Sequence, residues 1–153
     1  MSYKNVLIAV DLTEESDQVL AKAKHVAETD GAKLSLVHVV KPIEHVYGGF
    51  GAVGLAGDFS AQMATLEQQA VSHAQEQLAK MGDSIGVARD RRFVAVGSAS
   101  REIHRIAKED GMDLIVIGSH GRHGLGLLLG STANGVLHGA SCDVLAVRVA
   151  LKD

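Results

Sequence analysis

A glycine-rich segment, residues 118–132, holds the residue types that best fit the binding of a phosphate group (GSHGRHGLGLLLGST). Glycines let a backbone approach an anion closely and present successive N–H groups to it. Ser131 and Thr132 stand where a helix is expected to begin, and the N-terminus of a helix favours negative charge. Arg122 adds a charged donor. A glycine-rich turn with Ser131 as an ordinary helix cap remains the alternative.

Two standard nucleotide-binding loops are excluded. The chain has no Gly-Lys-Ser or Gly-Lys-Thr, so it has no Walker A loop. The dinucleotide fingerprint fails because Leu129 stands where a pattern that starts at Gly124 needs Gly or Ala. That pattern also has to follow the first strand, and this segment follows the fourth apolar run.

Asp11 is a second candidate, because it comes directly after the first apolar run, residues 6–10. A carboxylate there can accept hydrogen bonds from a sugar hydroxyl or help to hold a metal, and it can equally cap a local turn. His120 and His123 are more consistent with phosphate contact than with a metal site. Three or four ligands are needed for a metal, no third is evident, and the lone cysteine, Cys142, lies elsewhere.

Composition limits the class of protein. The chain has 153 residues, which predicts one domain, 1–153, with 46% hydrophobic and 22% charged residues. A net charge of −3 and 3% aromatic residues argue against general nucleic-acid binding. No apolar run is long enough for a membrane helix, and the N-terminus lacks a signal-peptide pattern. We expect a soluble, cytoplasmic protein.

Apolar runs alternate with helical patterns along the chain. The predicted strands are residues 6–10, 34–40, 93–96, 114–117 and 144–149. A helix is predicted between an N-cap at Thr13 and Gly31, and a third from Ser98 or Ser100 to Gly111. The second predicted helix follows the loop at 44–58, has its apolar stripe over 63–81 and stops at Gly82, and a fourth begins at Ser131. Residues 44–58, with five glycines, form a predicted loop. This order predicts a doubly wound α/β domain with a parallel sheet and a site at the carboxyl ends of strands one and four.

Several collinear segments resemble the universal stress protein family over essentially the whole chain. They are residues 4–11 (KNVLIAVD), 36–39 (LVHV), 113–121 (DLIVIGSHG), 130–132 (GST) and 142–147 (CDVLAV). The resemblance implies a five-stranded parallel sheet in the order 3-2-1-4-5 with four helices, an adenine-nucleotide α-hydrolase-like fold. Nucleotide-binding members of the family carry Gly, two residues, Gly, nine residues, then Gly and Ser or Thr. Here Gly118, Gly121 and Gly130 with Ser131 match, but residues 122–129 make the second spacing one residue shorter.

The resemblance also implies a site, residue by residue. Adenosine would be lined by the end of the first strand, adenine by the end of the second, and ribose and phosphates by the glycine-rich segment. The residues concerned are, in that order, Ala9, Val10 and Asp11; Val39; and Gly118, Gly121, Gly130, Ser131 and Thr132. Loop position and charge add His120, Arg122 and His123.

We therefore expect a cytoplasmic stress-response protein that binds ATP or AMP, with Mg²⁺ as an option if the ligand is ATP. We expect it to act by binding or signalling as a homodimer, paired through the apolar strand Val144–Val149 at the edge of the sheet. A slow ATPase or phosphate-transferring enzyme is an alternative. It is less favoured, because Asp11 is the only acid placed in the crevice and phosphoryl transfer needs a positioned metal and base. Because the spacing between Gly121 and Gly130 is one residue short, a third hypothesis stays open, a protein that binds no nucleotide and acts through protein contacts.

Overall fold

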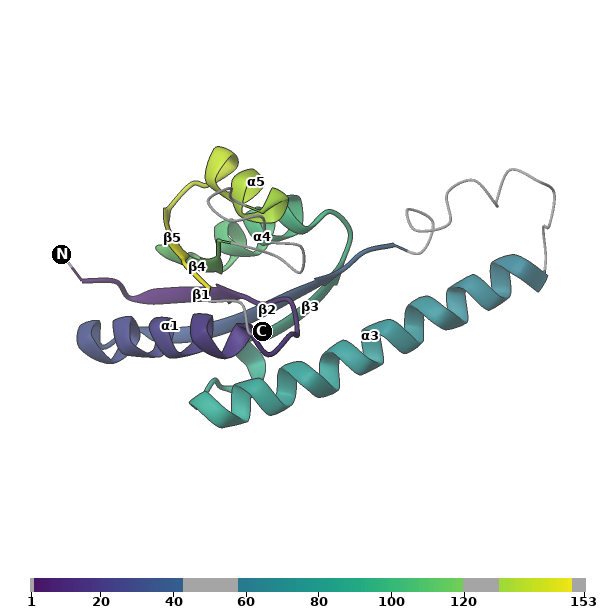
Figure 1. The fold of residues 1–153 in the computed structure, drawn as a ribbon, viewed down its shortest axis with the longest axis horizontal. Helices are drawn as coiled ribbons and strands as arrows, with labels where there is room; N and C mark the ends of the chain where they lie inside the picture. The colour runs from purple at the N-terminus through teal and green to yellow at the C-terminus, as the bar shows by residue number, and fades with distance from the viewer. Residues whose placement is uncertain (1, 43–57, 120–129, 150–153) are drawn as a thin grey trace.

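A five-stranded parallel sheet forms the centre of the computed structural model, which describes residues 2–42, 58–119 and 130–149 (Figure 1). The strands are β1 (Asn5–Ala9), β2 (Lys33–Val40), β3 (Arg92–Val96), β4 (Leu114–Gly118) and β5 (Asp143–Val147). The helices are α1 (Ser16–Asp30), α3 (Asp58–Ile85), α4 (Ala99–Glu109) and α5 (Ser131–Gly139), with a 3₁₀ turn, η2 (Arg89–Arg91), before β3. All strand pairs are parallel and the order is β3-β2-β1-β4-β5. The predicted fold class and strand order are confirmed.

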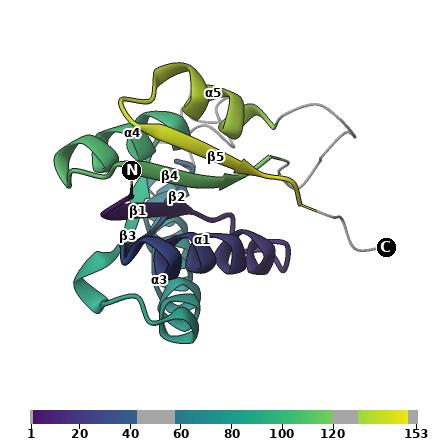
Figure 2. The same ribbon diagram turned by 90° about the vertical axis from the view of Figure 1, so that its left-hand side faces the viewer.

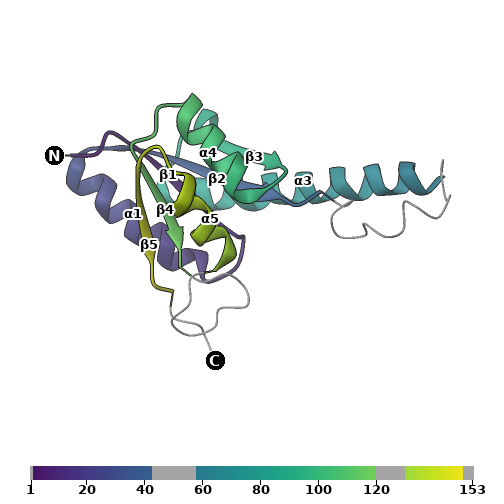
Figure 3. The ribbon, with the colours of Figure 1, turned by 90° about the horizontal axis from the view of Figure 1, so that it is seen from above.

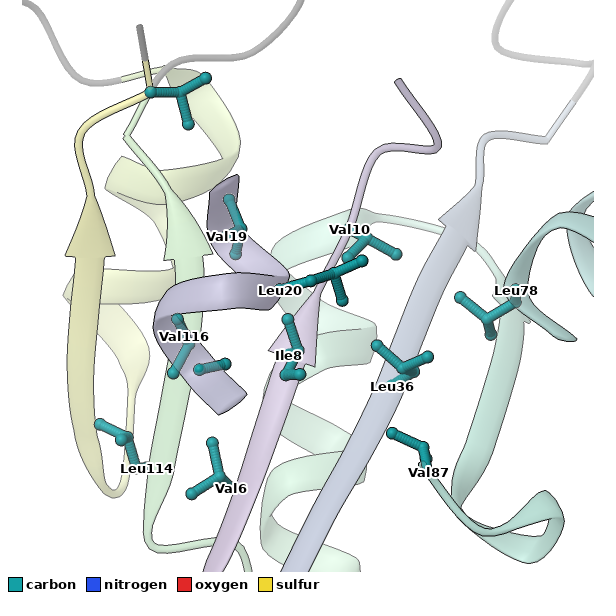
Figure 4. Close-up of a cluster of buried hydrophobic side chains, with 12 residues drawn as sticks. Val6, Ile8, Val10, Val19, Leu20, Leu36, Leu78, Val87, Leu114 and Val116 are labelled. Atoms are coloured by element: carbon teal, nitrogen blue, oxygen red, sulfur yellow. The ribbon is translucent and has the colours of Figure 1, made fainter. Parts of the chain in front are cut away.

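Helices cover both faces of the sheet, α1 and α3 on one and α4 and α5 on the other (Figures 1 and 2). The central strand β1 is a continuous apolar run because both of its faces are buried. Val6 and Ile8 point to the α1 and α3 side (Figure 4), and Leu7 points to the α4 and α5 side. All three side chains are fully buried. The sheet therefore holds two apolar cores, and its strand ends are fixed relative to each other.

The helix α3 differs from its prediction at its C-terminal end. It begins at Asp58, where the predicted loop ends, and its N-terminal part extends past the sheet (Figure 3). Gly82 lies inside the helix, not at its end. A Cβ at this position would overlap the guanidinium group of Arg92, which donates from Nη2 to the Val87 carbonyl oxygen at 2.6 Å. Gly82 therefore makes room for an arginine, and the predicted stop was wrong.

The last strand was predicted over Val144–Val149 and is Asp143–Val147 in the structure. Its final register partner is Gly118, which pairs with Val147 and is the last residue of β4. The strand ends there because its only neighbour in the sheet ends there. Among the residues that the structure describes, no helix is long and apolar enough to cross a membrane.

Candidate functional site

The parallel register brings the predicted residues of the first two strands to one edge of the sheet. Ala9 lies beside Ile117 of β4 and Val37 of β2. Val10 continues this alignment by donating from its N–H to the Val37 carbonyl oxygen at 3.0 Å. Asp11 follows at the surface, near the level of Gly118 and Val39. The carboxyl ends of β1, β2 and β4 therefore form one rim, as the sequence predicted.

The start of α5 returns to this rim. The Gly130 N–H donates to the Ser119 carbonyl oxygen at 2.7 Å, and the Ser119 N–H donates to Val147 at 2.7 Å. Gly130 is the N-cap of α5 and offers no side chain to the first turn, where Ser131 and Thr132 are exposed. The positive end of a helix, with N–H groups that have no side-chain cap, therefore lies beside the end of β4.

Asp11 organises the turn between β1 and α1. Its Oδ1 accepts hydrogen bonds from the Thr13 N–H at 3.1 Å, the Thr13 hydroxyl at 2.7 Å and the Ser16 hydroxyl at 2.9 Å. Burial by itself raises the pKa of Asp11, but these hydrogen bonds favour the carboxylate and hold the pKa below its ordinary value. The N-cap of α1 is Glu15, not the predicted Thr13. Turns precede the helix there, in which the Ser16 N–H donates to the Thr13 carbonyl oxygen at 3.0 Å.

Two further features fix the end of β1. Leu12 has a φ of +64°, a left-handed conformation that costs a non-glycine residue about 1–2 kcal/mol. Its side chain packs against the α1 and α3 core, which helps to offset that cost. The His38 ring donates from Nδ1 to the Val10 carbonyl oxygen at 2.7 Å, because a carbonyl can only accept. Backbone strain of this kind, held in place by neighbours, is common at binding sites.

Comparison with known proteins decides the family. The family model described as "Universal stress protein family" matches residues 2–148. Universal stress protein A homolog 2 of Coxiella burnetii is 42% identical over 149 residues, which cover 97% of this chain and 97% of that protein. The chain belongs to the universal stress protein family.

Solved structures agree on the fold of this family member. Universal stress protein UspA from Lactobacillus plantarum matches with a TM-score of 0.77 and 21% identity, over 97% of this chain and 99% of that one. A universal stress protein crystallised in complex with cAMP matches with a TM-score of 0.65 and 21% identity, over 98% of this chain and 100% of that one. At these identities the likeness concerns the fold alone.

Four of the predicted residues, His120, Gly121, Arg122 and His123, lie outside the described part of the chain, and their roles stay predictions. The others meet at the rim described above. They are Ala9, Val10, Asp11, Val39, Gly118, Gly130, Ser131 and Thr132.

The structure adds residues that the sequence reasoning missed. A hollow of about 470 Å³ is lined by Lys41, residues 97–100, Ser131 and Thr132. Lys41 comes directly after β2, and Ser98, the N-cap of α4, comes two residues after the end of β3. Their position after a predicted strand could have identified them, because every parallel strand ends at the same edge of the sheet. The sequence prediction considered only the ends of strands one, two and four.

Proposed function

We propose that this universal stress protein family member binds an adenine nucleotide, AMP or ATP, at the carboxyl ends of β1 and β4. The observation that carries the proposal is the return of the α5 N-terminus to the end of β4, through the Gly130–Ser119 hydrogen bond. N–H groups that lack a side-chain cap therefore lie beside the end of β4, and Asp11 follows β1, the neighbouring strand across the point where the strand order reverses. The related structure in complex with cAMP supports an adenine nucleotide as the ligand class.

Each part of the nucleotide has a proposed partner. Asp11 Oδ2, which takes no part in the three bonds made by Oδ1, accepts from a ribose hydroxyl. Val39 contacts the adenine ring, and Ala9 and Val10 line the adenosine. Gly118, Gly130, Ser131 and Thr132 hold ribose and phosphates, with Gly121, His120, Arg122 and His123 as further contacts. With ATP as the ligand, Mg²⁺ is an optional companion.

We propose binding and signalling rather than turnover as the activity, in a cytoplasmic stress response. Phosphoryl transfer needs a metal and a base or a water-orienting residue near the transferred group. Asp11 is held by Thr13 and Ser16 through Oδ1, so it is a fixed hydrogen-bond acceptor with a lowered pKa and a poor proton acceptor. A slow ATPase remains the second candidate.

The test is the thermal unfolding midpoint of nucleotide-stripped protein with AMP, ATP and GTP. A ligand at 100 times its dissociation constant stabilises by about 2.7 kcal/mol, which raises the midpoint of a domain of this size by about 5–10 °C. We expect that shift with AMP or ATP and none with GTP. No shift with any nucleotide at millimolar concentration contradicts the proposal and favours a nucleotide-free interaction protein. Release of phosphate from ATP, measured on the same sample, decides between binding and hydrolysis.

We further propose a homodimer that pairs through β5, the strand that lies within the predicted segment Val144–Val149 except for its first residue, Asp143. This strand is an edge of the sheet, and its side chains from Val144 to Val147 are only half-buried. An apolar edge strand is a ready template for pairing with a second copy.

Light scattering tests the dimer. A monomer has a mass of 16.0 kDa and the proposed dimer has twice that. The Val147 carbonyl oxygen bonds to β4, so strand alternation directs the Ala146 N–H outward. Ala146→Pro removes this donor and is expected to give a folded monomer, whereas Val96→Pro on the opposite edge strand, β3, should leave the dimer intact. A wild-type mass of 16.0 kDa, or a folded dimer of Ala146→Pro, contradicts pairing through β5.

A further inference from the structure

The hydrogen-bond ladder between β1 and β2 stops one bond short of its natural end. Ala9 is paired with Val37, and the Val10 N–H donates to the Val37 carbonyl oxygen at 3.0 Å. In a parallel ladder the N–H and C=O of one residue point to the same neighbouring strand. The next bond would therefore run from the Val39 N–H to the Val10 carbonyl oxygen. No backbone N–H among the described residues donates to that oxygen.

The His38 side chain takes the Val10 carbonyl oxygen instead. Its Nδ1 lies 2.7 Å from this oxygen, and the ring nitrogen donates because a carbonyl can only accept. Leu36, two residues before His38, and Val10 both pack in the core beneath α1 and α3 (Figure 4). Strand alternation puts the half-buried His38 on that same face of the sheet, beside the end of β1.

The backbone groups of Val39 are left without a partner in the described structure. The Val40 carbonyl oxygen accepts from the Gly97 N–H at 3.0 Å, so the polar backbone groups of Val40 face β3. Successive residues of a strand point these groups in opposite directions, so those of Val39 face the side of β1. Val39 is half-buried, and an unpaired backbone N–H is costly unless water or a ligand satisfies it.

The chain beyond Val10 cannot resume pairing with β2. Asp11 is tied into the turn by its three bonds from Thr13 and Ser16. Leu12 has a φ of +64°, which no strand residue adopts, and its side chain packs in the core. The Val10 carbonyl is thus the last group of β1 that could pair with Val39, and the His38 ring holds it.

We propose that His38 is a positioning residue of the nucleotide site, which takes the Val10 carbonyl out of the ladder and keeps the Val39 N–H and C=O open to the base. The inference rests on the proposed nucleotide function, which puts Val39 against adenine, and adds the side chain that prepares this contact. A donor beside an acceptor suits a base edge that offers one acceptor and one donor, as adenine does with a ring nitrogen and its amino group. His38 acts through the backbone and needs no contact with the ligand.

Calorimetry on the full chain, with AMP and ribose 5-phosphate as probes, tests this role. His38→Phe keeps a ring but loses the donor, so the Val10 carbonyl can turn back to the Val39 N–H. The variant should bind AMP about tenfold more weakly, the loss of one hydrogen bond to the base, and ribose 5-phosphate within about twofold of the wild type. His38→Asn, whose amide nitrogen stands where Nδ1 stands, should restore most of the AMP affinity.

Arg91→Met is the matched control for the loss of a structural hydrogen bond. The Arg91 Nε donates to the Leu34 carbonyl oxygen at 3.0 Å, at the opposite end of β2. This variant should have a lower unfolding midpoint than the wild type but should bind AMP equally well. A purely structural histidine would give the same result on replacement, so the AMP affinity separates the two roles.

Amide hydrogen exchange followed by NMR gives a readout that needs no nucleotide. In the free wild type the Val39 amide should exchange at least tenfold faster than the Val37 amide, which lies inside the β1–β2 ladder. In His38→Phe the Val39 amide should exchange more slowly than in the wild type, because it gains the Val10 carbonyl as its acceptor. Addition of AMP to the wild type should slow it as well.

Equal AMP affinity in the wild type and His38→Phe overturns the role of His38 and leaves the proposed function standing. A Val39 amide as protected as that of Val37 in the free wild type overturns it too, and this measurement decides if His38→Phe does not fold. If the wild type binds neither AMP nor ATP, the proposed function fails. Exchange then decides alone whether His38 diverts β1: slower exchange at Val39 in His38→Phe supports it, and unchanged exchange overturns it.

Discussion

Replacement of Asp11 tests whether this residue supports the fold as well as the proposed site. Asp11→Ala removes the acceptor of three hydrogen bonds. Thr13 is half-buried, so its two donors can turn to water, but Ser16 is only 3% exposed and its hydroxyl is left unpaired. An unsatisfied buried donor costs about 1–3 kcal/mol, so we expect a loss of about 1.5 kcal/mol. For a chain of this size this lowers the unfolding midpoint by about 3–6 °C.

Asp11→Asn removes the negative charge of the side chain but keeps an oxygen that can accept hydrogen bonds. The amide oxygen can still accept from Thr13 and Ser16, so the loss at neutral pH should be smaller, about 0.5–1 kcal/mol. Because the folded protein lowers the pKa of Asp11, the charge stabilises above the ordinary pKa of 3.8, and this stability is lost as the pH falls through the folded value. The difference between the wild type and Asp11→Asn should therefore shrink below pH 4.

Urea unfolding followed by circular dichroism at pH 7, 5, 4 and 3 measures these differences. Asp17→Asn, an exposed acid in the first turn of α1, is the matched control for removal of one negative charge near the same helix. The reasoning is refuted if Asp11→Ala stays within about 0.5 kcal/mol of the wild type, the range of an ordinary surface substitution. It is also refuted if Asp11→Asn and the wild type lose stability in parallel from pH 5 to pH 3.

Three further predictions concern other described residues. Ser35 is fully buried in β2 and its hydroxyl has no hydrogen-bond partner there. Ser35→Ala should therefore raise the free energy of unfolding, measured in urea titrations, by about 1 kcal/mol. A decrease of that size would show that the hydroxyl has a partner. Gly82→Ala should lower the free energy of unfolding by about 1–3 kcal/mol, because the new methyl group displaces Arg92. A Gly82→Ala variant as stable as the wild type would show that the arginine is free to move. Burial and the neighbouring acids raise the pKa of Cys142, the single cysteine, above its ordinary 9.0. Its reaction with a thiol reagent at pH 7 should be much slower than in the urea-unfolded chain and should accelerate above pH 9, and equal rates at pH 7 would contradict this.

Local patterns in the chain were sufficient for the elements and for the edge of the sheet at which the candidate residues lie. Apolar runs of branched residues predict buried strands, and β1 is buried on both faces as its run indicates. Asp11 and Gly118 could be placed at the carboxyl edge of the sheet because the end of every parallel strand reaches that edge. The strand order itself came from the family resemblance, since periodicity does not state which strands are neighbours.

Contacts between distant segments could not be read from those patterns. Gly82 has the sequence signature of a helix stop, but the side chain that requires it, Arg92, comes from the next strand. The hollow joins Lys41, the start of α4 and the start of α5, segments that meet only because α4 and α5 pack closely at Gly135 and Gly139. Short-range periodicity reports how one segment buries its own face, and it carries no information about which other segment covers that face. Packing decides that, and in this protein packing brings the two helix N-termini and one lysine around a common space.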